Sequence, residues 1–159
     1  MLGKKATPAW LLDLHRYLGG MAVVMTGIHL LGLVADSYVY FGWKEILVPF
    51  AAQWQPGPVA WGVVAFYILV TIEVTSLMMK KMPKRAWRVI HQTSWILFGI
   101  VTIHGLQAGT DVKNPAYRWV ALASIQGVFF LTVIRIMAQR KARRAASRPR
   151  PAAAAGVAG

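Results

Sequence analysis

Residues 10–35 read WLLDLHRYLGGMAVVMTGIHLLGLVA, a run that is apolar apart from Asp13, His15, Arg16 and His29. At a helical rise of 1.5 Å per residue, a run of this length crosses a bilayer core of about 30 Å. Lipid offers no partners for free backbone groups, so the run is expected to form a transmembrane helix. It is too long, and too charged near its start, to be a cleaved signal peptide.

Three further stretches have the same character and contain only a few polar residues each. They are residues 59–79, 86–108 and 117–138. Of the 159 residues, 57% are hydrophobic and 14% are charged, whereas a soluble domain has about 25% charged residues. We therefore predict an all-α integral membrane protein in which residues 1–138 form a four-transmembrane-helix bundle. The chain has no cysteine, which excludes disulfides, thiolate metal sites, iron–sulfur clusters and covalently attached haem.

The basic residues are distributed unevenly between the two sides of these spans. The chain has 18 Lys and Arg against five Asp and Glu. Fifteen of the 18 fall on one side, and only Lys44, Lys113 and Arg118 fall on the other. The positive-inside rule then predicts a multi-pass plasma-membrane protein with both termini cytoplasmic. Because the charge reports topology, it argues against nucleic acid as a partner. The basic residues 139–159 are predicted to be a disordered cytoplasmic tail near the lipid surface.

The longest connection, residues 36–58, joins the first two spans on the outer side. Its stretch 42–54 is expected to lie in the membrane interface as a short amphipathic helix. Six of the seven tryptophans, Trp87 among them, lie near predicted span ends. This placement is typical of the aromatic belt of membrane proteins.

All four histidines of the chain lie inside predicted spans, two in the first and two in the third. His15 and His91 follow the tryptophan at the start of their spans by five and four residues. His29 and His104 each precede an aspartate by seven residues. Because the two spans run in the same direction, His15 and His91 share one depth, and His29 and His104 share another. Ionisable groups inside a membrane are costly and mark functional sites.

The separation between the two depths points to haem. The histidines of one span are 14 or 13 residues apart, which is roughly 20 Å along a helix. One zinc ion cannot bind all four, because zinc–nitrogen bonds are about 2 Å long. A haem iron needs only two axial ligands, so two facing histidines at each depth can hold one haem. We predict two stacked, non-covalent haems with the four histidines as axial ligands; histidines that only pack helices are the alternative.

Helix geometry adds a condition to this hypothesis. On an ideal helix, 14 residues leave the second histidine about 40° from the first, and 13 residues leave it about 140° away. The third span is therefore expected to be distorted, with Gly99 as the candidate position. Otherwise its two histidines approach the haems from different sides of the helix.

Four short motifs resemble a known family: LHRYLG at 14–19, GIHL at 27–30, WRVIH at 87–91 and IHGL at 103–106. They are similar to the ferric reductase-like transmembrane family. That family includes ferric-chelate reductases, NADPH oxidases and the haem-binding membrane subunit of the bacterial methionine sulfoxide reductase system. The resemblance covers residues 10–138. It implies two b-type haems, the inner one between His15 and His91 and the outer one between His29 and His104, and electron flow from the cytoplasm to the outer face.

The sequence also departs from this family's pattern. It has four spans where many relatives have six, and it has no flavin or nicotinamide domain and no G-x-G-x-x-G fingerprint. The chain is therefore expected to be the membrane electron-transfer component of an oxidoreductase. Electrons would come from a separate flavoprotein reductase or from quinol. They would leave to a ferric chelate or to a partner flavoprotein or reductase at the outer face.

Three charged residues near or within the spans are candidates for supporting roles. Arg16 and Arg88 lie close to the inner histidines, where they either bind haem propionates or anchor the helices at the interface. Glu73 is the one acid deep in a span; it relays protons, binds quinone or pairs with an arginine. Two alternative functions follow from these features. One is a quinone-linked cytochrome b, and the other is a structural or assembly protein without a cofactor.

Overall fold

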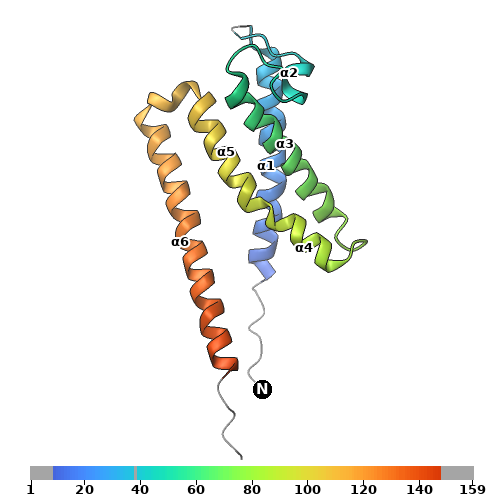
Figure 1. The fold of residues 1–159 in the computed structure, drawn as a ribbon, viewed down its shortest axis with the longest axis vertical. Coiled ribbons are helices and arrows are strands. Elements are labelled where there is room, and N and C mark those ends of the chain that lie inside the picture. The colour runs from blue at the N-terminus through green and yellow to red at the C-terminus, as the bar shows by residue number, and fades with distance from the viewer. Residues whose placement is uncertain (1–8, 38, 148–159) are drawn as a thin grey trace, which may run out of the picture. The chain divides into compact units, whose positions relative to one another are not determined.

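The computed structural model describes residues 9–37 and 39–147, and this part of the chain contains helices and no strand (Figure 1). The elements are α1 (Ala9–Ala35), α2 (Trp43–Leu47), α3 (Pro56–Leu77), α4 (Lys84–Gln92), α5 (Ser94–Ala108), the 3₁₀ turn η1 (Thr110–Lys113) and α6 (Pro115–Ala146). Four segments of the described chain are long and apolar enough to cross a membrane: α1, α3, α4 with α5, and α6. The prediction of an all-helical membrane protein with four candidate spans is confirmed.

The chain divides into two compact units, Met1–Val112 and Lys113–Gly159. In the first unit α3 is the central helix and packs against α1, α4 and α5. The buried side chains of this unit belong to α3 and to the connection before it, and α1, α4 and α5 have none among the described residues. Helices that leave apolar surface outside the protein core suit a lipid environment, where that surface is not exposed to water.

The third span is broken two residues after His91, where α4 ends and α5 begins. The N–H of Thr93 donates to the carbonyl of Ile90 at 3.0 Å, and its hydroxyl donates to the same carbonyl at 2.7 Å. This bond reaches back three residues instead of four, so the last turn of α4 is tightened. A threonine hydroxyl that competes for a backbone carbonyl favours such a break. The predicted distortion is present, but it lies at Thr93; Gly99 lies within α5.

The connection between α1 and α3 folds back onto the helices. Its side chains Phe41, Ile46 and Ala52 are buried in one cluster with Val59 and Val63 of α3. In Figure 1, α2 lies beside the end of α1 and the start of α3. We call residues 39–55 the cap, because they close this end of the unit.

The structure corrects the length of the amphipathic helix predicted over residues 42–54, while its place in the membrane interface stays a prediction. Only Trp43–Leu47 are helical, and Ile46 is 4% exposed. The helix ends because Pro49 follows it closely and Phe50 has a left-handed backbone with φ of 64°. Proline and left-handed residues do not continue an α-helix. The side of the cap that carries Phe41, Ile46 and Ala52 therefore packs on protein, while Trp43 and Phe50 are 64% and 72% exposed.

A hydrogen bond ties the cap to the middle of α3, and its loss is testable. The hydroxyl of Tyr67 donates to the carbonyl of Leu47 at 2.7 Å. Tyr67→Phe removes this bond and is expected to cost about 0.5–1.5 kcal/mol of cap stability. The same loss of free energy should make hydrogen exchange of the α2 amides roughly 2- to 13-fold faster, because the cap opens more often. Tyr17→Phe, on the exposed surface of α1, is the matched control; equal exchange in both variants would contradict this role.

The last helix is longer than the sequence analysis expects. α6 continues to Ala146, so residues 139–146 are helical, which corrects the prediction of disorder from residue 139. Alanine, arginine and lysine are strong helix formers, and Arg143 and Arg144 in the last turn complement the negative end of the helix dipole. At its start, the Asn114 side chain accepts from the N–H of Ala116 at 2.9 Å, a helix N-cap. Residues 148–159 of the predicted tail lie outside the described residues.

Candidate haem-ligand site

The four histidines form two pairs in space, each joining α1 to the third span. The ring centroids of His15 and His91 are 5.8 Å apart, and those of His29 and His104 are 6.5 Å apart. The ring planes in the two pairs are inclined at 80° and 78°. Because α1 is continuous, its two histidines are separated by about 21 Å along the helix axis. The structure thus brings together the same residues that the sequence analysis expects at equal depths.

Both separations fit one metal between two imidazoles. Two metal–nitrogen bonds of about 2 Å on opposite sides of an ion place the ring centres about 6 Å apart. No group of three or more His, Cys, Asp or Glu side chains that could hold a bare metal ion occurs among residues 9–37 and 39–147. A haem supplies its own four equatorial nitrogens and needs only two protein ligands. The donor set therefore fits haem, while the role of the histidines as ligands stays a prediction.

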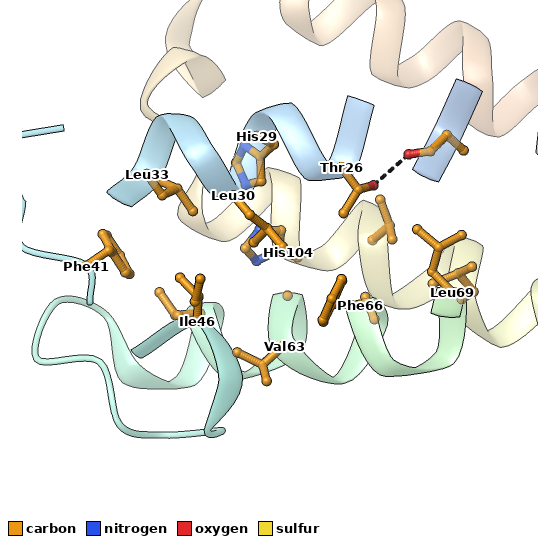
Figure 2. Close-up of a pocket in the computed structure, with 16 residues that line it drawn as sticks. Thr26, His29, Leu30, Leu33, Phe41, Ile46, Val63, Phe66, Leu69 and His104 are labelled. Carbon is orange, nitrogen blue, oxygen red and sulfur yellow. Dashed lines mark hydrogen bonds between the residues drawn. The ribbon is translucent and has the colours of Figure 1, made fainter. Parts of the chain in front are cut away.

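An apolar cavity of about 270 Å³ lies at the His29/His104 pair. Figure 2 shows His29 from α1 and His104 from α5 facing this cavity, with Phe41 and Ile46 of the cap at one end. The remaining walls come from α1, α3 and α5, and Thr26 is the one lining residue besides the histidines with a polar side chain. The Thr26 hydroxyl donates to the Ala22 carbonyl at 2.8 Å. The cavity can therefore receive a flat apolar group whose only strong protein ligands are the two imidazoles.

The His104 ring has a fixed neighbour on α3. Its Nδ1 lies 2.8 Å from the carbonyl oxygen of Pro58. A carbonyl only accepts hydrogen bonds, so Nδ1 must carry the proton and donate. In a neutral imidazole the lone pair is then on Nε2, which is the form that binds a metal.

The His91 ring is held differently. It stacks on Trp87, with ring centroids 5.1 Å apart and planes inclined at 22°, and its Nδ1 lies 3.4 Å from the Ser76 hydroxyl. The indole Nε1 of Trp87 is buried and has no hydrogen-bond partner among the described residues. Buried donors are almost always paired. The unpaired N–H of Trp87 beside His91 could therefore donate a hydrogen bond to an acceptor on a bound group.

The charged residues proposed for supporting roles lie near the His15/His91 pair. Arg16 lies 3.6 Å from Asp13, one turn earlier on α1, and both side chains are exposed. Arg88 is exposed on α4. Glu73 of α3 is half-buried, interacts electrostatically with His91, and its Oε2 lies 3.6 Å from the position that a Cβ at Gly19 would take. Binding of haem propionates by Arg16 and Arg88 stays a prediction.

Several residues at the two pairs escape the sequence analysis. Trp87 is interpreted there as a belt residue, although its spacing of four from His91 places both on one helix face. The Pro58 carbonyl has no signal in the sequence, because any residue supplies a carbonyl. Gly62 has a weak signal, since a small residue on a span lets another group approach the helix closely.

Comparison with known proteins bears on most of the first unit. Residues 3–103 match the family model described as the ferric reductase like transmembrane component. The chain belongs to this family. The matched region includes His15, His29 and His91 and ends one residue before His104. No curated protein and no solved structure matches the chain.

Membership confirms the resemblance found in the sequence over residues 3–103, and residues 104–138 lie outside the match. Members of the ferric reductase-like family transfer electrons in membranes, and the described part of this chain has four candidate membrane spans. The histidine pairs are the feature of the structure that bears most directly on how this chain would do so.

Proposed function

We propose that the chain carries electrons across the plasma membrane through two b-type haems. The observation that carries the proposal is the pair of His–His contacts, at 5.8 Å and 6.5 Å between ring centroids, about 21 Å apart along α1. Two redox groups at these depths would let an electron cross the membrane in several short transfers. Electrons do not otherwise cross the apolar interior.

The chain's own residues supply the setting for this transfer. His15 and His91 would hold one haem, and His29 and His104 the other. When bound, each haem supplies an iron that accepts and releases a single electron. The apolar walls at His29 and His104 keep water away, and a dry shell influences the reduction potential of a bound metal. Trp87 Nε1 offers a donor to the group bound at His91.

The proposed direction is from the cytoplasm outward. The positive-inside rule places both termini in the cytoplasm, with His15 and His91 at the inner level and His29 and His104 at the outer level. A separate flavoprotein reductase or quinol would deliver electrons inside. A ferric chelate or a partner flavoprotein or reductase would accept them outside. The exposed basic residues in the last turns of α6 would attract anionic lipid at the inner face.

Transfer across a sealed membrane tests this function. The purified chain is reconstituted into liposomes that contain ferricyanide, and dithionite is added outside. We expect trapped ferricyanide to be reduced many-fold faster than in protein-free liposomes, because the protein is the only conductor through the bilayer. Reduction at the rate of protein-free liposomes, in vesicles shown to contain haem-loaded protein, would contradict the proposal.

A quinone-linked cytochrome b is the second candidate, and Glu73 is the observation that favours it. A half-buried carboxylate near His91 could receive the proton that a quinol releases when it gives up an electron. A quinol analogue should then reduce the haems without any flavoprotein, and Glu73→Gln should slow this reduction. Rapid reduction by a flavoprotein combined with no reduction by quinol would exclude this candidate.

A further inference from the structure

His104, the third-span histidine beneath the cap, is held by one turn of α3 through a backbone carbonyl and a glycine. The two α3 positions involved are Pro58 and Gly62. The Pro58 carbonyl lies 2.8 Å from Nδ1 of His104. A Cβ built on Gly62 would lie 2.6 Å from Cε1 of the same ring, 2.9 Å from Nδ1 and 3.0 Å from Nε2.

These two contacts are linked by helix geometry. In an α-helix the carbonyl of residue 58 points along the axis toward residue 62, four positions later. A ring that bonds to this carbonyl from the side must therefore lie over residue 62. Real Cβ atoms do not come within 3.0 Å of a ring atom, so only glycine leaves the ring this position. A methyl group at 62 would force the ring away and break its hydrogen bond to Pro58.

We infer that Pro58 and Gly62 form a cradle that fixes both the tautomer and the direction of the His104 ring. The Pro58 carbonyl holds the proton on Nδ1, and the missing side chain of Gly62 lets the ring sit against α3 with Nε2 free. Gly62 and His104 both line the apolar cavity, as His29 does. Gly62 is thus a positioning residue that acts through His104. This inference rests on the proposed function for its use in haem binding, but not for the ring's tautomer.

The other third-span histidine provides the contrast. His91 Nδ1 faces the Ser76 hydroxyl at 3.4 Å, which is long for a hydrogen bond, and a hydroxyl both donates and accepts. Ser76 therefore does not dictate which nitrogen of His91 is protonated. The cradle therefore makes the two proposed haem sites differ in the basicity of their third-span ligand. The hydrogen bond from His104 to a carbonyl increases the basicity of its free nitrogen.

The tautomer is measured first, in the haem-free full-length chain in detergent micelles. The ¹⁵N chemical shifts of the His104 ring distinguish a protonated Nδ1 from a protonated Nε2. We expect protonated Nδ1 in the wild type and a mixture of tautomers in Gly62→Ala. A protonated Nε2 in the wild type would overturn the inference, and so would identical shifts in the two proteins. This measurement does not require that the chain binds haem.

The haem-loaded chain gives the second readout, with Gly57→Ala as the matched control. Gly57 is also in the first turns of α3, and a Cβ there meets nothing within 4 Å. Loss of a residue that orients a ligand typically weakens metal binding about 10- to 100-fold. Gly62→Ala should therefore lose or weaken one haem and retain the spectrum of the other, which also shows that the variant is folded. Equal haem content and equal reduction potentials in Gly62→Ala and Gly57→Ala would overturn the inference. A wild-type chain without haem would instead refute the proposed function, and the tautomer measurement would still decide on the cradle.

Discussion

Replacement of His29 by alanine is expected to halve the haem content of the purified chain and to abolish electron transfer across the membrane. The variant leaves His104 alone at the cavity, and a haem held by one axial ligand binds more weakly. The His15/His91 pair lies about 21 Å away along α1, so its haem should remain. Haem quantified per chain by absorption spectroscopy, and ferricyanide reduction in liposomes, measure the two effects.

Two further variants make this result specific. His15→Ala should also halve the haem content, but the haem that remains should have a different reduction potential, because it is the one at His29 and His104. Met25→Ala is the control, since Met25 lies one turn before His29 and is 55% exposed. It should keep the wild-type content. If His29→Ala kept both haems, His29 would not be an axial ligand.

Replacement of Ile46 by alanine is expected to open the cap. Ile46 is 4% exposed, belongs to the cap cluster and lines the cavity. Truncation of a buried isoleucine to alanine costs about 2–5 kcal/mol through lost burial and the space left behind. The cap amides should exchange roughly 30-fold faster or more. Water that enters the cavity should also shift the reduction potential of the haem bound there.

The neighbouring Leu47 provides the matched control for this prediction. It lies on the same short helix and is 40% exposed, so Leu47→Ala removes less buried surface than Ile46→Ala. Its exchange rates should stay within about 2-fold of the wild type, as is usual for surface substitutions. If Ile46→Ala and Leu47→Ala had the same exchange rates, the cap would not depend on its buried face.

The spans and the pairing of histidines could be predicted because membrane helices obey simple length and depth rules. A run such as residues 10–35 must be helical in lipid, and equal distances from span ends place His15 near His91 in depth. The structure has these rings 5.8 Å apart. The ideal-helix calculation also predicted a distortion of the third span, because 13 residues do not return to the same face.

The parts that escaped prediction depend on contacts between distant residues. The break lies at Thr93 because its hydroxyl and its N–H both donate to the Ile90 carbonyl. A threonine also occurs within unbroken helices, so its presence in the sequence does not predict a break. The cap could not be predicted because an apolar loop beside a membrane packs equally well on lipid or on protein. Only the tertiary fold buries Ile46 against Val59 and Val63. The orientation of the His104 ring depends on its hydrogen bond to a backbone carbonyl. Every residue has a backbone carbonyl, so no pattern of side chains in the sequence predicts this bond.

The most direct test of the account is a reduced-minus-oxidised visible spectrum of the purified wild-type chain, with haem quantified per chain. The account predicts two b-type haems per chain, both six-coordinate and low-spin, because two histidines would bind each iron. Protein that is folded in detergent, was produced with ample haem and shows no haem absorbance would contradict it. The four histidines would then serve to pack the helices of a membrane protein that has no cofactor.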